Sequence, residues 1–345
     1  MLHIEREIAE QPEIIGELLE REAENTRRIA KAIREFNPAF VHIAARGTSD
    51  NAARYAQYTF GIHAHLPVGL ATPSIHTLYE TSPNLSHALV LGISQSGKSE
   101  DVCRVVSDAR EQGALTVAIT NAPDSPLAQA AEYHINVMTG PEVSVAATKT
   151  YTAQLAAVAL LMTTVVDQAE LTQALTQLPA YMAETLSQAD KIAQWTERYR
   201  YMERFVVLGR GYNYCTAFEI SLKIKELCYI IGEGYSEADF RHGPFALIDP
   251  GFPVIVVAPK GKTLATLADL VTKLGERQAE TLIISNDSAI IKQGRKGMLL
   301  PSGLPEWLSP IPAVVPGQIF AMRLAIEKGH SVDAPRGLNK VTVTR

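Results

Sequence analysis

Short apolar runs alternate along this chain with longer stretches in which apolar residues recur at helical spacing. The short runs predict five strands in the first half and four in the second, with helices between them. Such alternation is typical of an α/β fold whose parallel sheet is covered by helices on both faces. The predicted strands span residues 40–45, 67–71, 88–93, 115–120 and 133–137, and then 205–209, 253–258, 281–284 and 313–315.

The segments outside these runs divide the chain. The first residues and the middle connector both have the apolar spacing of helices. The tail contains Pro335, Gly337 and an alternating stretch at 341–344, so we expect it to be extended and to lie on the rest of the fold. We therefore expect a helical segment (1–36), a first α/β unit (37–165), a helical connector (166–200), a second α/β unit (201–330) and the tail (331–345).

Four landmarks recur about 164 residues apart, and this spacing indicates a duplicated α/β unit. Chance similarity between α/β units would not keep all four in register. Only the first copy keeps several hydroxyl groups around its loop glycine. The matching pairs are residues 40–47 with 204–211, Gly97 with Gly261, residues 116–121 with 281–286, and Gln154 with Gln318.

Bulk properties narrow the class of protein. The length of 345 residues suffices for two domains, and a net charge of −5 with a pI near 6.0 offers no basic surface for nucleic acid. We find no long uncharged apolar span and no secretory start, so we expect no membrane segment. Cys103, Cys215 and Cys228 lie in apolar helical patterns and indicate buried free thiols in a reducing compartment, the cytoplasm.

The loop from Gly92 to Ser99 carries the clearest chemical signal. It follows an apolar run and precedes a helical pattern, an arrangement that gathers backbone N–H groups around a phosphate. We interpret it as a site for a phosphate monoester, held by Ser94, Ser96, Ser99 and the start of the following helix, with Gln95 beside them. Such a site needs no metal.

Two other interpretations of this loop are open. The letters of the loop satisfy the G-x-x-x-x-G-K-[ST] pattern of nucleotide-binding proteins, but Gly92 lies inside the apolar run and the loop begins only at Ser94. Such proteins also use an Asp at the end of an apolar strand to bind magnesium. The candidate here, residues 245–249, is short and is followed directly by Pro250, so this strand is doubtful. A simple helix cap would explain one serine but not three.

A second strand-to-helix turn, Arg46-Gly47-Thr48-Ser49-Asp50, precedes the loop in the same unit. Ser49 can add a hydroxyl at the neighbouring strand end, where open α/β sheets bind ligands. An ordinary helix N-cap explains Thr48 and Ser49 equally well. Glu142 precedes a predicted helix at 145–163, where it either binds sugar hydroxyls or simply caps that helix.

Glu219, Lys223 and Glu226 share one face of a predicted helix. A solvated, salt-bridged face is the common explanation of such a pattern. Here the surrounding residues are apolar, which favours a face that is not fully exposed. His242 follows on a Gly/Pro loop, and a His, a Lys and a carboxylate are the groups that aldose–ketose chemistry requires.

At this point the sequence resembles the sugar isomerase (SIS) domain family. The resemblance rests on residues 90–97, on Gly47-Thr48-Ser49, on residues 142–149 and on the layout of two α/β units, so it covers nearly the whole chain. It implies two tandem SIS domains, each a doubly wound, flavodoxin-like parallel sheet flanked by helices, with an extended tail. Within the family the chain is similar to the isomerase half of glutamine–fructose-6-phosphate aminotransferase and to the SIS-type glucosamine-6-phosphate deaminases.

The resemblance also implies roles. Glu226 matches the base that moves a proton between C1 and C2, Lys223 its neighbouring lysine, and His242 the ring-opening histidine that reaches the site from the partner subunit of a homodimer. Lys340 matches the lysine of the family's C-terminal tail, although composition alone would make it a solvated tail lysine. Arg241 stands where the aminotransferase often has lysine. No cofactor and no metal are implied.

These roles lead to an expected function: deamination of glucosamine 6-phosphate to fructose 6-phosphate and ammonia. The chain begins Met1-Leu2-His3 rather than with the nucleophilic cysteine of a glutaminase, which favours the deaminase over the aminotransferase. An ammonia-dependent synthase, a phospho-sugar isomerase and a deglycase of 6-phosphorylated fructosamines share the same proton transfer. A non-catalytic phospho-sugar sensor would need the phosphate loop but not Glu226 and His242.

Overall fold

The computed structural model describes residues 2–340 and divides the chain into two compact units, each built around one parallel sheet. The first predicted helical segment is shared between the units, because the division falls after Pro12. The tail residues 341–344, for which an extended alternation was expected, lie outside the described residues. The sheet-A unit comprises the described residues of Glu13–Glu142, Lys149–Gln177 and Asn339–Arg345, and the sheet-B unit those of Met1–Pro12, Val143–Thr148 and Leu178–Leu338.

Sheet A has the strand order β2-β1-β3-β4-β5 with all pairs parallel, which is the flavodoxin-like arrangement. Its central strands β3 and β4 are buried along their whole length, because helices cover both faces. The strands are β1 (Phe40–Ala44), β2 (Val68–Leu70), β3 (Ala88–Ile93), β4 (Leu115–Thr120) and β5 (Tyr133–Asn136).

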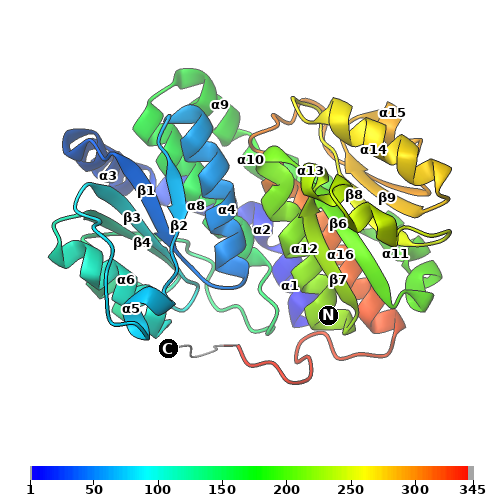
Figure 1. Cartoon of the computed structure of the whole chain (residues 1–345), viewed down its shortest axis with the longest axis horizontal. Coiled ribbons are helices and arrows are strands. Elements are labelled where there is room, and N and C mark those ends of the chain that lie inside the picture. The colour runs from blue at the N-terminus through cyan, green and yellow to red at the C-terminus, as the bar shows by residue number, and fades with distance from the viewer. Residues whose placement is uncertain (1, 341–345) are drawn as a thin grey trace. The chain divides into compact units, whose positions relative to one another are not determined.

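Two helical layers enclose sheet A (Figure 1). One layer contains α3 (Ala23–Phe36), α4 (Thr48–His63) and α8 (Lys149–Val166), in which α3 and α4 both pack on α8, and α9 (Ala169–Thr176) contacts α8 as well. The other contains α5 (Ser74–Thr77), α6 (Glu100–Glu111) and α7 (Pro126–Ala130).

Helix α8 qualifies the expectation of no long apolar span. By length and composition alone this helix could cross a membrane, but 83% of it is buried within the protein, as in the core helix of a globular unit. Its apolar side chains contact α3 and α4. Burial on all sides, rather than a lipid environment, accounts for its composition.

Sheet B has the order β10-β9-β8-β6-β7, which is the order of sheet A when read from the opposite edge. Helices α12 and α16 pack together on one face, and α13 to α15 lie on the other (Figure 1). The strands are β6 (Arg204–Gly209), β7 (Ile231–Ser236), β8 (Pro253–Val257), β9 (Glu280–Ser285) and β10 (Lys296–Leu299). The helices are α10 (Leu178–Leu186), α11 (Ala189–Thr196), α12 (Tyr214–Cys228), α13 (Glu237–Arg241), α14 (Leu264–Glu276), α15 (Ser288–Ile291) and α16 (Pro310–Glu327).

The two N-terminal helices lie where the division between the units falls. Helix α1 (His3–Ala9) packs on α16, and the carboxylate of Asp333 accepts hydrogen bonds from the backbone N–H groups of His3 and Ile4 at its start (3.1 and 2.9 Å). Helix α2 (Gln11–Arg21) contains the point at which the two units divide.

The strand predicted at residues 313–315 is wrong. These residues lie within α16, whose side chains are buried around nearly the whole helix, and a short apolar run does not distinguish a buried helix from a buried strand. Strands β7 and β10 were not predicted, because glycines interrupt their apolar pattern. In β7 a Cβ at Gly232 would collide with the Phe205 ring, so close packing explains the glycine.

The cysteines provide a test of the packing. Cys215 and Cys228 are buried, whereas Cys103 is only half-buried, which corrects the expectation that all three are buried. Burial raises the pKa of Cys228 to about 12. Burial and the charge of Asp101 raise the pKa of Cys103 as well.

At about pH 8, near the usual pKa of a thiol, we therefore expect the native protein to react slowly with a disulfide reagent and the unfolded protein to react at all three thiols. Rapid labelling of Cys228 in the native protein, located by mass spectrometry, would contradict this packing.

Candidate functional site

The phosphate loop and the Gly47-Thr48-Ser49 turn leave the same edge of sheet A. Strand β1 pairs with β3 in parallel, and Ala44 stands opposite Gly92. The chain then turns into α4 after β1 and into α6 after β3. Two helix N-termini therefore begin at neighbouring strand ends, the usual place for ligands in this fold.

The loop serines organise the backbone of the loop. Ser94 Oγ accepts a hydrogen bond from Gly97 N (3.2 Å) and lies 3.4 Å from Ser99 Oγ, while Ser96 Oγ accepts from Lys98 N (3.3 Å). Ser99 occupies the N-cap position of α6, but its side chain makes no capping hydrogen bond. A simple helix cap therefore does not explain the three serines.

Gly97 fixes the shape of the loop. Its φ of +62° lies in the left-handed region, and a Cβ there would collide with the Ser125 side chain. Its carbonyl also accepts from Leu127 N (3.0 Å), which joins the loop to the next helix. The loop is thus held in one conformation by its neighbours.

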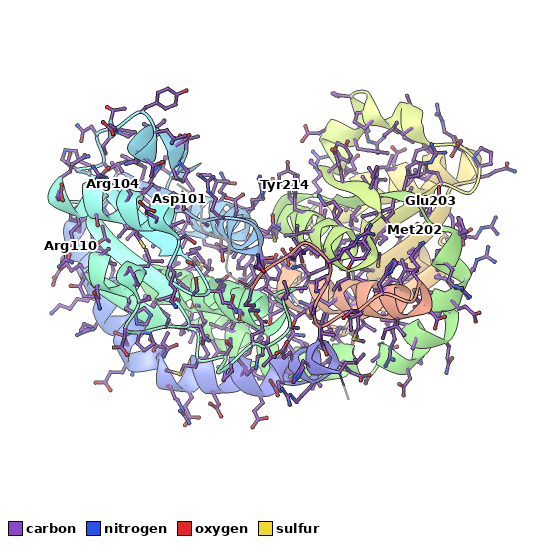
Figure 2. The ribbon with its side chains drawn as sticks, turned by 90° about the horizontal axis from the view of Figure 1, so that it is seen from below. Asp101, Arg104, Arg110, Met202, Glu203 and Tyr214 are labelled. Carbon is purple, nitrogen blue, oxygen red and sulfur yellow. The ribbon has the colours of Figure 1, made fainter. Side chains whose placement is uncertain are left out.

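Helix α6 begins with a buried acidic residue that sequence reasoning missed. Asp101 is fully buried, and its Oδ2 accepts a hydrogen bond from Arg46 Nε (2.6 Å), so the residue before Gly47 is tied to the first turn after the loop. Figure 2 shows Asp101 on α6, followed by Arg104 and Arg110. Burial raises the pKa of Asp50, while the charges of Arg54 and Arg46 oppose that rise.

The turn after β1 does not form the N-cap that we considered. Gly47 itself is the N-cap residue of α4, so Thr48 and Ser49 are the first two residues of the helix. Ser49 is nearly buried, and its Oγ accepts a hydrogen bond from Gln154 Nε2 of α8 (3.0 Å). The Ser49 hydroxyl is therefore part of a side-chain contact rather than of a helix cap.

Glu142 joins three parts of the sheet-A unit. Its Oε1 accepts from Thr150 N (3.1 Å) in the first turn of α8, so the capping alternative is confirmed. Its Oε2 accepts from Thr150 Oγ1 (3.0 Å), from Gln95 Nε2 of the phosphate loop (2.8 Å) and from Lys340 Nζ of the tail (2.8 Å). Lys340 is thus paired with a buried carboxylate and is not a solvated tail lysine.

The corresponding loop of sheet B is closed by a carboxylate of the chain itself. Glu306 accepts hydrogen bonds from Lys262 N (2.8 Å), Thr263 N (3.2 Å) and Thr263 Oγ1 (2.9 Å). A Cβ at Gly261 would collide with the same carboxylate. Where the first copy has Ser94, Gln95 and Ser96, this one has Ala258, Pro259 and Lys260. The N–H groups that receive an anion in such loops are already occupied here.

The predicted catalytic face of α12 is buried. Lys223 and Glu219 are 1% and 0% exposed, and Lys223 Nζ lies 3.4 Å from Glu219 Oε1 and 2.5 Å from Glu226 Oε2. The solvated alternative is therefore wrong. Glu226 is partly accessible, with 21% of its side chain exposed, and within the described residues its buried Oε2 has no donor beside it other than the Lys223 ammonium.

His242 makes no hydrogen bond or ion pair with Lys223 or Glu226 within the described residues. It ends α13, ahead of Gly243 with φ +131°, and lines a hollow of about 440 Å³ together with Arg210, Glu237 and Arg241. Within residues 2–340 its imidazole makes no hydrogen bond, and none joins it to Glu226.

The residue before His242 is firmly held. Arg241 forms an ion pair with the buried Glu237, a second with Asp269 (2.8 Å), and donates to Thr266 O (2.9 Å). The chain therefore fixes the backbone at His242 through its neighbour.

Among the described residues no group of three or more His, Cys, Asp or Glu side chains could hold a metal ion.

The chain belongs to the SIS domain family. The family matches it twice, at residues 40–164 and 199–327, which correspond to sheet A and sheet B with their helices. This agrees with the two parallel five-stranded sheets and confirms the predicted fold class.

Individual relatives place the chain more closely. It is 33% identical over 342 residues to glutamine–fructose-6-phosphate aminotransferase of Aquifex aeolicus, covering 98% of this chain and 57% of that protein. The chain thus spans little more than half of that curated relative. The C-terminal domain of the aminotransferase from Francisella tularensis has a TM-score of 0.87 and 25% identity, covering 96% of this chain and 98% of that one. Glucosamine-6-phosphate deaminase from Thermotoga maritima shares the fold at a TM-score of 0.83 and 22% identity, covering 99% of this chain and 100% of that one.

The closed loop of sheet B yields a prediction about stability. In Glu306→Gln the charged acceptor of three hydrogen bonds is lost, and we expect the free energy of unfolding of the sheet-B unit to fall by about 1–2 kcal/mol. Both tryptophans, Trp195 and Trp307, belong to this unit, so tryptophan fluorescence during urea unfolding reports on it.

Glu276→Gln, at the exposed end of α14, is the matched control and should change stability by less than about 0.5 kcal/mol. Equal stability of the Glu306 variant and the wild type would show that the carboxylate does not close the loop.

Proposed function

We propose that this chain is a glucosamine-6-phosphate deaminase, which converts glucosamine 6-phosphate and water into fructose 6-phosphate and ammonia. Membership of the SIS family and the 33% identity to the aminotransferase support an enzyme that acts on a phosphorylated amino sugar. The observation that carries the proposal is the pairing of the buried Lys223 ammonium with the partly exposed Glu226, whose Oε2 has no donor beside it other than Lys223 within the described residues. A carboxylate beside an ammonium is suited to moving a proton next to a carbonyl.

Phosphate recognition is assigned to the sheet-A unit. Ser94, Ser96 and Ser99, with the N–H groups at the start of α6, offer hydrogen-bond donors to a phosphate monoester. Gly47, Thr48, Ser49 and Gln95 complete this set of substrate-binding residues. The loop of sheet B has no such role, because Glu306 occupies its N–H groups.

The proton transfer is assigned to Glu226. Once the sugar ring is open, the carboxylate removes the proton from C2 and the electron pair of that C–H bond forms the C1–C2 double bond of an enolamine. Lys223 stabilises the negative charge that develops on the neighbouring oxygen. Return of the proton to C1 gives an imine at C2, and water hydrolyses it to the ketone with release of ammonia. The sequence of steps balances without oxidation or reduction.

The remaining candidates have supporting roles. His242 opens the sugar ring by exchanging protons at the ring oxygen and the anomeric hydroxyl. In the proposed homodimer it acts on the substrate of the partner subunit. Lys340 is the amine that can form an imine with a ketose, and Glu142 is the buried carboxylate that holds it at the sugar site. A cytoplasmic location remains part of the proposal.

The reverse reaction is the second candidate. The curated relative is an aminotransferase, and the same enolamine and imine form when an amine is added to fructose 6-phosphate. The two candidates use the same residues and differ in the source and fate of nitrogen.

Replacement of the base tests the proposal directly. In Glu226→Gln we expect kcat for ammonia and fructose 6-phosphate release to fall about 10³-fold, since general-base catalysis contributes on this order. The Kd for glucosamine 6-phosphate, measured by calorimetry, should change little because the phosphate contacts remain.

The matched control is Glu203→Gln, an exposed carboxylate of the same unit that Figure 2 labels, and it should keep full activity. Wild-type protein that binds the phospho-sugar without turnover would move the assignment to a sensor or to a deglycase of other amine adducts.

The source of nitrogen separates the two directions. With fructose 6-phosphate and ammonium we expect glucosamine 6-phosphate to form, but no product with glutamine as donor. Glutamine hydrolysis needs an activated nucleophile, and in this chain Cys215 and Cys228 are buried while the pKa of Cys103 is raised by its burial. Glutamine-dependent product from the isolated 345-residue chain, detected by mass spectrometry, would contradict this expectation.

A further inference from the structure

Gln154 is a buried polar residue that the proposed mechanism leaves without a role. It lies on α8 and is 1% exposed. Its Nε2 donates to Ser49 Oγ (3.0 Å), while its Oε1 is buried and has no hydrogen-bond partner within the described residues. Buried amides normally satisfy both ends, so a half-satisfied one next to a candidate ligand-binding hydroxyl calls for a functional explanation.

The other copy of the repeat shows the amide in a purely structural role. Gln318 on α16 accepts from Gln11 Nε2 (3.0 Å) and donates to Thr148 O (3.3 Å), so both of its ends are used. At the position of Ser49 this copy has Asn213, which donates to Ser309 Oγ (2.7 Å). Only the copy with the open phosphate loop therefore combines the Gln with a serine hydroxyl.

The direction of the hydrogen bond decides what Ser49 can do. A hydroxyl has one hydrogen to donate and accepts through its lone pairs. Because Gln154 Nε2 donates to this oxygen, the hydrogen of Ser49 can point to another acceptor. A phosphate dianion offers only acceptors, so it gains from a hydroxyl that is fixed as a donor.

We propose that Gln154 is a positioning residue that holds Ser49 Oγ so that its hydrogen is donated to the substrate phosphate. The inference rests on the proposed assignment of phosphate to the sheet-A loop. It deepens that assignment, because it adds a residue that acts on the phosphate only through Ser49.

A double-mutant cycle tests the inference by calorimetry with inorganic phosphate and with fructose 6-phosphate. Gln154→Leu and Ser49→Ala should each weaken the Kd about tenfold, which is typical of one hydrogen bond to a charged group. The double variant should bind no more weakly than Ser49→Ala, because residues that act through one another are not additive. Where turnover is measured, Gln154→Leu should raise KM and leave kcat within about twofold.

Gln154→Glu keeps the shape of the side chain and reverses its hydrogen bonding. The carboxylate accepts the Ser49 hydrogen and removes it from the phosphate, so this variant should bind phosphate at least as weakly as Gln154→Leu. Gln318→Leu is the matched control from the other copy: it should lower the melting temperature while the Kd for phosphate stays unchanged.

Three results would overturn the inference. These are Kd losses that multiply in the double variant, wild-type affinity in Gln154→Glu, or an equal loss of affinity in Gln318→Leu. If the wild type binds fructose 6-phosphate but does not deaminate, the proposed reaction fails while the same titrations still decide the role of Gln154. If the wild type binds neither ligand, the phosphate assignment fails and the inference falls with it.

Discussion

Parallel pairing of β1 with β3 is the constraint on which the candidate phosphate site depends. With Ala44 opposite Gly92, the two strands end at nearly the same level, and each is followed by a short turn or loop that leads into a helix. The N–H groups of two helix starts are thereby brought to one edge of the sheet without help from any particular side chain. Arg46 and Asp101 then tie the two turns together, and Gly97 allows the bend between them. The site is a consequence of strand register first and of residue type second.

The two units show what residue type adds to one topology. Their strand orders are the same, yet one loop presents three serines and the other receives Glu306. A carboxylate and a phosphate satisfy the same N–H groups, so a single acidic side chain is sufficient to turn an anion-binding loop into a structural one. The two copies also differ at the matching amides: Gln318 has hydrogen-bond partners at both ends, whereas within the described residues Gln154 has a partner only at Nε2.

Local patterns were sufficient to predict the parts of the fold that are determined locally. Strands such as β3 and β4 and the helix α12 follow from apolar runs and spacing. Residues whose partners are distant in sequence were not predictable in this way. The pairing of Arg46 with Asp101, the contact of Gln154 with Ser49 and the burial of β7 against Phe205 all depend on tertiary packing. The same limit explains why residues 313–315 were taken for a strand.

The charges on α12 argue for function through their energetics. A buried ion pair adds little to stability, because the cost of removing both charges from water offsets most of their attraction, and an apolar pair would pack equally well. Lys223 nevertheless lies between two carboxylates, and in the described part of the chain Oε2 of one of these, Glu226, has no donor beside it other than Lys223. Such an arrangement is poor for folding but suited to proton transfer, because the carboxylate has a cation beside it and a lone pair that no other donor occupies. The presence of Glu219, Lys223 and Glu226 on one face of α12 is therefore better explained by the proposed reaction than by the fold.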